Sequence, residues 1–162
     1  MHHSDFLALL ALIYRPDIYL ELGVAEGETF VKVRPYCGRA IGVDPSPPSM
    51  EGDFRPQTTD KFFKSFNIKV DMIFIDADHS FSSAKKDLKN SYKLLNDGGI
   101  IIMHDTDPVD DKLFDPGYCG DSYKLVDLIE DNFLDLNITT LPMTEAGLSL
   151  LTKKADTRTH RR

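Results

Sequence analysis

The segment YLELGVAEGETF, residues 19–30, joins an apolar run to a glycine-rich turn, and a segment of helical character follows the turn. Gly23 permits a tight turn, and Gly27 permits close approach of the chain to the following helix. Dinucleotide-binding turns have the pattern G-x-G-x-x-G, whereas this turn reads G-x-x-x-G with Ala25 between the glycines. The pattern predicts a strand–turn–helix unit, and by itself it does not select a ligand.

Two carboxylates lie beside this turn. Glu21 is near the end of the apolar run, and Glu26 lies between the two glycines. The N-terminus of the following helix offers free N–H groups that favour an anion, but the two carboxylates would repel a diphosphate. A cationic ligand with one carboxylate and an adenosine would not be repelled in this way. Glu26 has two interpretations, a ligand contact or an acid that favours the start of the helix.

A third acid ends the next apolar run, AIGVD, at residues 40–44. Asp44 lies 21 residues after Gly23, and an acid at this spacing accepts hydrogen bonds from both hydroxyls of a ribose. Nicotinamide-dependent enzymes have the same spacing. Asp44 therefore predicts a nucleoside and does not select between cofactors.

Strands and helices alternate over most of the chain, which predicts a doubly wound, parallel α/β sheet. The runs at 72–75 and 100–103 are apolar throughout, so we place them in the middle of the sheet. Residues 50–58 predict at most a short third strand, and the last two strands flank a short turn that indicates an antiparallel hairpin. The expected strands are 18–22, 40–44, 70–76, 100–103, 137–143 and 148–153, and the expected helices are 4–14, 26–34, 58–66, 80–95 and 121–134.

Local signals predict where the helices begin and end. Ser4 or Asp5 is the expected N-cap of the first helix, and Asp121 is that of the last. The helix at 80–95 is expected to bury Leu95 and to stop at the D-G-G sequence that follows.

Composition restricts the class of protein. The chain has 162 residues, 41% of them hydrophobic, and a net charge of -7, which suits one globular domain and disfavours broad nucleic-acid binding. We expect a single domain over 1–153 and a flexible basic tail over 154–162. Cys37 and Cys119 have no metal-site or disulfide spacing, and the apolar run at 6–14 is too short to cross a bilayer. The expectation is a cytoplasmic protein without a membrane or nucleic-acid partner.

Acids also follow the two central strands. Asp76 follows the run at 72–75, and Asp105 follows the run at 100–103 after His104. Neighbouring strands lie about 4.8 Å apart, so two carboxylates there repel unless one is protonated or a cation lies between them. Because oxygen ligands suit Mg²⁺, we predict a cation between these two acids.

Two histidines accompany these acids. His79 follows Asp76 by three residues and can reach the same cleft as a general base. A helix-capping or surface position is equally compatible with the sequence. His104 is a metal ligand, a group that orients a ligand, or a buried structural residue, and the sequence leaves these three interpretations open.

From about residue 19 to residue 153, the chain resembles the class I S-adenosylmethionine-dependent methyltransferases. The motifs that carry the resemblance occur in order: TTDKFF at 58–63, DMIFIDADH at 71–79, GGIIIMHDT at 98–106 and GLSLL at 147–151. Within that superfamily they are similar to those of the small metal-dependent O-methyltransferases. The glycine turn alone is weak evidence, whereas the ordered set of motifs supports both the fold and the cofactor.

The resemblance implies a Rossmann-like sheet of order 3-2-1-4-5-7-6, with strand 7 antiparallel. It implies that the glycine turn holds the methionine part of S-adenosylmethionine, that the acid after the second strand holds the ribose, and that Asp60 lies near the adenine. The implied cofactor-binding residues are Glu21, Gly23, Ala25, Glu26, Gly27, Asp44, Asp60 and Asp76.

The resemblance also implies a Mg²⁺ site with Asp76 and Asp105 as ligands. In relatives that act on sugar hydroxyls, a histidine matching His79 serves as the base, and Asp76 is the alternative base here. Catechol-type relatives have Asp-Asn where this chain has Asp-Thr. Threonine is the weaker ligand, so the third ligand is left open between His104, Asp107 and water.

The expected function is methyl transfer from S-adenosylmethionine to a hydroxyl of a small molecule or sugar, with the assistance of a divalent metal. One alternative is a nucleoside-binding or S-adenosylmethionine-binding module without catalysis. Another is a nicotinamide-dependent oxidoreductase, which the glycine pattern and the closing hairpin disfavour. The short N-terminal cap leaves the site open or completed by another subunit, so a homodimer is a further expectation.

Overall fold

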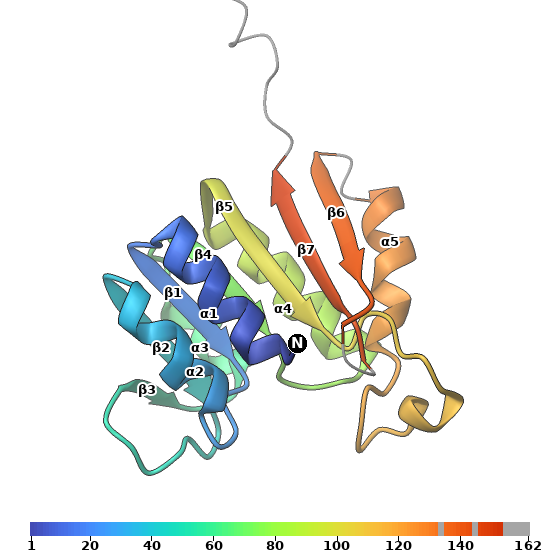
Figure 1. The fold of residues 1–162 in the computed structure, drawn as a ribbon, viewed down its shortest axis with the longest axis horizontal. Coiled ribbons are helices and arrows are strands. Elements are labelled where there is room, and N and C mark those ends of the chain that lie inside the picture. The colour runs from blue at the N-terminus through green and yellow to red at the C-terminus, as the bar shows by residue number, and fades with distance from the viewer. Residues whose placement is uncertain (133–134, 144–145, 154–162) are drawn as a thin grey trace, which may run out of the picture.

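A computed structural model describes residues 1–132, 135–143 and 146–153, which form a central sheet with helices on both faces (Figure 1). The described strands make one seven-stranded sheet of order β3-β2-β1-β4-β5-β7-β6, so the predicted order is confirmed. The strands are β1 (Ile18–Leu22), β2 (Arg39–Asp44), β3 (Asp53–Pro56), β4 (Val70–Ile75), β5 (Leu95–His104), β6 (Leu136–Leu141) and β7 (Leu148–Lys153).

The strand directions agree with the prediction as well. β1 pairs in parallel with β2 and β4, and the β2–β3 and β4–β5 pairs are also parallel. β7 runs antiparallel to both β5 and β6, because so short a connection as the one between β6 and β7 joins only antiparallel strands. β3 has four residues, so the third strand is short as expected.

The helices divide between the two faces of the sheet (Figure 1). One face carries α1 and α2 over a core that includes Tyr19 and Phe74, and the other carries α3, α4 and α5 over a core that includes Leu20 and Ile73. Neighbouring residues of one strand enter different cores because successive side chains point to opposite faces. The helices are α1 (His3–Tyr14), α2 (Glu28–Val33), α3 (Thr59–Ser65), α4 (Phe81–Leu94) and α5 (Leu125–Asn132), with the 3-10 turns η1 (Arg34–Tyr36), η2 (Asp111–Phe114) and η3 (Ser122–Lys124).

The helix starts differ from the prediction, most of all at α5, which begins at Leu125 because Ser122–Lys124 form the 3-10 turn η3. The N-cap of α1 is His2, whose ring accepts a hydrogen bond from the Ser4 amide. Both expected caps therefore lie inside the helix, and that prediction is wrong. α2 begins at Glu28, later than expected, because the left-handed Gly27 before it, at φ 82°, still belongs to the turn.

The boundary between α4 and β5 also differs. The helix ends at Leu94, and Leu95 begins β5. β5 is therefore longer than the predicted 100–103, and its pairing with β4 shifts register before Ile100. Gly98 lies in this irregular part of the strand with φ 79°, so the D-G-G sequence is built into the sheet.

Two expectations lie outside the described residues: the end of the last helix near residue 134 and the basic tail at 154–162. Among the helices that the structure describes, none combines the length and the apolar character that crossing a bilayer requires.

Candidate functional site

The predicted site residues gather where the carboxyl ends of β1, β2, β4 and β5 meet at one edge of the sheet. Gly23 follows β1 with φ 83°, and a Cβ there would lie 2.0 Å from the carbonyl oxygen of Asp76. The turn after β1 and the end of β4 are therefore in direct contact. Only glycine permits this approach, and it places Asp76 beside the turn.

Glu21 is buried near the end of β1. The Tyr19 hydroxyl donates a hydrogen bond of 2.6 Å to its Oε2 atom. Burial raises the pKa of the Glu21 carboxyl to about 8, and the hydrogen bond from Tyr19 opposes this only in part. A nearby cation favours the ionised form of such an acid. Glu21 and Glu26 line one pocket of about 310 Å³ at the glycine turn, so this pocket suits a cationic group.

Asp44 holds the glycine turn. Its Oδ2 atom accepts hydrogen bonds from the amides of Val24 at 3.0 Å and Ala25 at 3.1 Å, and its Oδ1 accepts one from Ser46 at 2.7 Å. Burial opposes the charge of Asp44, but these amides outweigh it and hold the pKa of the carboxyl below its ordinary value. The amides of Val24 and Ala25 are thus engaged within the protein, which the sequence pattern did not indicate.

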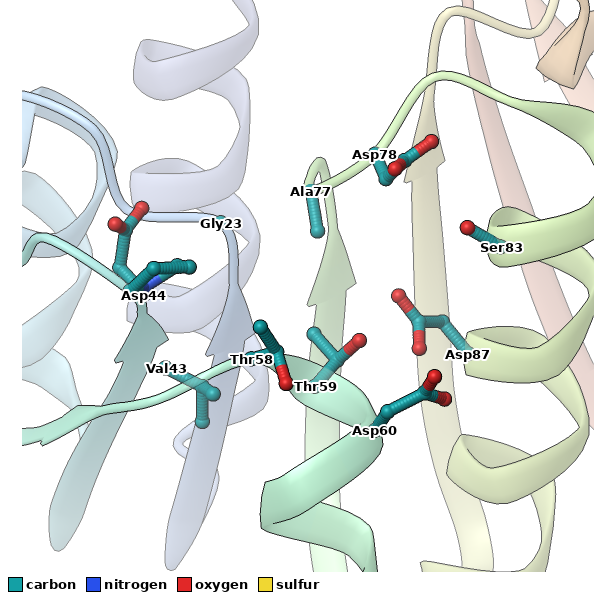
Figure 2. A pocket seen from close by; sticks show the side chains of 11 residues that line it. Gly23, Val43, Asp44, Thr58, Thr59, Asp60, Ala77, Asp78, Ser83 and Asp87 are labelled. Carbon is teal, nitrogen blue, oxygen red and sulfur yellow. The ribbon is translucent and has the colours of Figure 1, made fainter.

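A cavity of about 410 Å³, here called the β2–α4 cavity, extends from Asp44 to the inner side of α4. Figure 2 shows Asp44 on one side and Asp87 on the other, with two threonines between them. Asp60 also lines the cavity, and its exposed carboxylate lies 3.5 Å from the Lys86 ammonium. Asp44 and Asp60 therefore share one cavity, whereas Asp87 was not recognised from the sequence.

A second space, a cleft of about 860 Å³, contains the acid–histidine cluster of Asp76, His79, His104 and Asp105. His79 Nε2 lies 3.7 Å from Asp76 Oδ1 and 3.3 Å from Asp105 Oδ2. His104 Nδ1 lies 3.4 Å from Asp76 Oδ1 and 3.1 Å from Asp105 Oδ1. The structure thus brings these four proposed residues together, whereas Asp107, the other candidate for the third ligand, is not among the residues that line the cleft.

One ion can contact three members of this cluster, because the ligand atoms of Asp76, His79 and Asp105 all lie within 4.8 Å of one another. Carboxylate oxygens suit Mg²⁺ and Mn²⁺, and an imidazole nitrogen extends the set to transition metals. His104 Nδ1 faces the same acids, and its buried Nε2 has no hydrogen-bond partner among the described residues. The geometry therefore makes His79 a second candidate for the nitrogen ligand, in addition to the predicted His104.

The cluster balances its own charges. Burial disfavours the charged form of His104, but the adjacent Asp105 and Asp76 outweigh it and raise the pKa of His104 to about 10. Burial likewise opposes the charge of Asp76, yet the two histidines hold its pKa well below the ordinary value. Asp76 is also the main cause of a raised pKa at His79. A divalent cation would bind here in exchange for protons.

A segment after β5 holds His79 in place. The amides of Asp121 and Ser122 both donate to the His79 carbonyl at 3.1 Å, and His79 Nδ1 contacts the Tyr118 carbonyl. The buried Ser122 hydroxyl donates to the Asp105 carbonyl at 3.1 Å. Through these contacts the segment at 118–122 joins His79 after β4 to Asp105 after β5. The Nε2 atom of His79 is left facing the acids.

The sequence did not identify these supporting residues. Asp121 was expected to cap the last helix, and its carboxylate accepts a 2.6 Å hydrogen bond from the Phe81 amide at the start of α4, whose N-cap is Ser80. Asp121 does stand at the N-cap of the 3-10 turn η3, which leads into α5, but its side chain makes no capping hydrogen bond there. His3 was not considered either, although its ring centroid lies 4.3 Å from that of His104 and it lines the cleft.

The sheet order, with its antiparallel seventh strand, and the acids at the strand ends define the class I methyltransferase fold. The sequence profile of a methyltransferase domain family matches residues 20–106. The chain belongs to this methyltransferase family. No curated protein sequence shows significant similarity to it.

Solved methyltransferase structures share the fold. An O-methyltransferase from Bacillus cereus in complex with S-adenosylhomocysteine is 18% identical, covering 94% of this chain and 80% of its own, with a TM-score of 0.75. The O-methyltransferase TomG from Streptomyces achromogenes in complex with S-adenosylmethionine is 14% identical, covering 94% and 80%, with a TM-score of 0.70. The N-methyltransferase NodS from Bradyrhizobium japonicum is 15% identical, covering 94% and 95%, with a TM-score of 0.69. The fold is thus common to enzymes with different acceptor atoms, and it does not select one.

Proposed function

We propose that this protein transfers the methyl group of S-adenosylmethionine to a hydroxyl of a small molecule, with the assistance of a divalent cation. The observation that carries the proposal is the position of the acid–histidine cluster beside the β2–α4 cavity. Gly23, Asp44 and Ala77 line both that cavity and the cleft that contains the cluster. A methyl donor that fills the cavity therefore has its reactive end next to a potential base.

The spaces around the glycine turn fit two parts of S-adenosylmethionine, the ammonium group and the ribose. The pocket at Glu21 suits the ammonium group, because a cation there relieves the cost of ionising a buried carboxyl. Asp44 keeps acceptor capacity for ribose hydroxyls, since a carboxylate has about four lone-pair sites and three are used by amides. The B. cereus and S. achromogenes neighbours, crystallised with S-adenosylhomocysteine and S-adenosylmethionine, support the same ligand for this chain.

The donor set fits a divalent cation. Asp76 and Asp105 would supply carboxylate oxygens, and His79 or His104 would supply a nitrogen. A bound cation lowers the pKa of an acceptor hydroxyl.

The residues of the chain have separate tasks in the proposed reaction. His79 accepts the hydroxyl proton at Nε2, the atom left facing the cleft by the contact of Nδ1 with the Tyr118 carbonyl. The acceptor oxygen then forms its bond to the methyl carbon while the carbon–sulfur bond breaks, and S-adenosylhomocysteine leaves with the sulfur lone pair. The protein contributes mainly by holding the reacting atoms in line. If His79 ligates the cation, Asp76 is the alternative base.

Titration calorimetry with S-adenosylmethionine and with MnCl₂, followed by an assay for S-adenosylhomocysteine, tests the proposal. The assay uses a panel of sugars and phenols with and without MgCl₂. We expect binding of the cofactor, binding of Mn²⁺, and product formation that chelation abolishes. Asp105→Asn is expected to weaken Mn²⁺ binding by at least roughly 10- to 100-fold, the loss that follows when a residue that only supports a metal ligand is replaced.

Asp17→Asn is the matched control, because Asp17 is an exposed acid at the opposite end of β1. Unchanged Mn²⁺ binding in Asp105→Asn would contradict the metal site. Cofactor binding without turnover on any acceptor, with or without metal, would instead identify a binding module without catalysis.

A further inference from the structure

Asp87 on α4 is a buried acid that the proposed reaction does not use. Its side chain lines the β2–α4 cavity and the residue is only 1% exposed. Neither carboxylate oxygen has a hydrogen-bond partner among the described residues, and the same holds for the buried hydroxyl of Ser91 one turn further along α4. Leaving a buried polar group without a partner costs free energy, so a carboxylate in this position points to a missing partner.

The neighbouring side chains do not supply that partner. Lys86 lies 3.5 Å from the exposed carboxylate of Asp60, and Lys85 lies over the ring of Phe81. Thr59 is near enough to lower the pKa of Asp87, but it does not meet hydrogen-bonding geometry. Burial nevertheless dominates and raises this pKa to about 6. A donor from a ligand would stabilise the ionised carboxylate.

The chemistry of the cavity restricts that ligand. Asp44, Asp60, Asp78 and Asp87 line it, and no lysine or arginine is among its described lining residues. Such a wall repels phosphate and attracts neutral or cationic groups that donate hydrogen bonds. A ligand that fills this cavity is therefore expected to lack phosphate, which fits the adenosine of the proposed methyl donor.

The positions of Asp44 and Asp87 in the cavity decide which part of the nucleoside reaches Asp87. Figure 2 shows Asp44 and Asp87 on opposite sides of the cavity, with the carboxylate of Asp87 turned from α4 toward Thr59. If Asp44 binds the ribose hydroxyls, the base extends toward α4. Adenine carries an exocyclic amine at its far edge, and an amine is a donor that matches a carboxylate acceptor.

We infer that Asp87 selects the base of the bound nucleoside by accepting a hydrogen bond from the exocyclic amine of adenine. This inference rests on the proposed function, because it assumes that the cavity holds the adenosine of S-adenosylmethionine. It differs from the sequence expectation, which placed Asp60 near the adenine. Asp60 has an exposed carboxylate with a lysine partner, whereas Asp87 has the unmet acceptors.

The test compares S-adenosylhomocysteine with S-inosylhomocysteine, in which a carbonyl replaces the amine, by competition binding at pH 8. Wild-type protein is expected to prefer the adenosine compound by roughly 100-fold, since a site built to bind an amine rejects an analogue without it. Asp87→Asn, whose amide can donate to the carbonyl, is expected to narrow this preference by roughly 10-fold or more. Asp60→Asn is the matched control, and it should keep the wild-type preference.

Equal weakening of both compounds by Asp87→Asn would overturn the inference and leave Asp87 with a structural task. An analogue with hydrogen in place of the amine provides a second measurement on wild-type protein alone, in case the variant does not fold. If wild-type protein binds this analogue as tightly as it binds S-adenosylhomocysteine, the inference is also overturned. If wild-type protein binds none of the three compounds, the proposed function itself fails and the inference falls with it.

Discussion

His79 Nε2 lies 3.3 Å from Asp105 Oδ2, although the two residues follow different strands of the sheet. Adjacent β4 and β5 bring the acids together, and the segment at 118–122 turns His79 toward them. Two histidines and two carboxylates are thereby placed in one cleft, beside the β2–α4 cavity. The arrangement predicts a specific effect for substitution of each of the residues considered below.

Substitution of His79 tests the assignment of the base. His79→Gln removes the proton acceptor, and kcat is expected to fall by roughly 10²- to 10⁴-fold. The affinity for S-adenosylhomocysteine is expected to change little, because His79 lines the cleft and not the β2–α4 cavity. Steady-state kinetics and calorimetry measure the two effects separately. A full rate in His79→Gln would transfer the assignment of the base to Asp76.

Substitution of Gly23 tests the contact between the turn and β4. Gly23→Ala combines a left-handed backbone with a Cβ at 2.0 Å from the Asp76 carbonyl, and we expect a loss of roughly 3 kcal/mol or more in the free energy of unfolding. Gly98→Ala is the matched control: its φ is 79°, but no atom lies within 4 Å of the added Cβ. Its cost should be about 1 kcal/mol. If urea unfolding shows the same loss of stability for Gly23→Ala and Gly98→Ala, the contact between the turn and β4 does not contribute to stability.

The buried Glu21 gives a prediction for pH. Its folded pKa of about 8 lies above the value of an unfolded glutamate, so between these values the folded protein binds more protons than the unfolded chain. Its contribution to the free energy of unfolding therefore falls as pH rises, by up to about 1.4 kcal/mol per unit. Glu21→Gln removes this dependence, and its stability relative to wild type should rise from pH 5 to pH 7.5.

Urea unfolding at several pH values in that range measures the difference. Glu51→Gln, at an exposed position, is the control and should follow wild type throughout. A constant difference between wild type and Glu21→Gln would show that Glu21 is ionised across the whole range.

Ser122 tests the segment that supports the cluster. Ser122→Ala removes a buried hydroxyl that donates to the Asp105 and Cys119 carbonyls, and we expect a loss of about 1 kcal/mol in stability. Because the segment positions His79, kcat should fall while cofactor affinity stays unchanged. Ser82→Ala, at an exposed position on α4, should leave both quantities at the wild-type level. A change in stability without a change in kcat would limit Ser122 to a structural task.

The strands were largely predictable, because apolar runs bounded by turns are local features. The hairpin indicated the antiparallel β7 for the same reason, whereas the order of the strands followed from the resemblance to the class I methyltransferases. Helix caps were less predictable: His2 and Asp121 have cap partners in places that propensity does not indicate, since Asp121 binds the amide of Phe81 on another helix. Leu95 was assigned to a helix because apolar residues suit both structures, and only pairing with β4 placed it in a strand.

The sequence by itself determined which acids stand at the strand ends, because each follows its strand directly, and parallel strands share one edge of the sheet. The tertiary structure alone decided how these acids, and one further acid on α4, are used. Asp44 turned out to hold the amides of Val24 and Ala25, and Asp87 turned out to be buried without a partner. Both facts depend on packing between segments that are distant in the chain. Burial and hydrogen-bond geometry set the energy of a carboxylate, and neither can be read from the spacing of residues in the sequence.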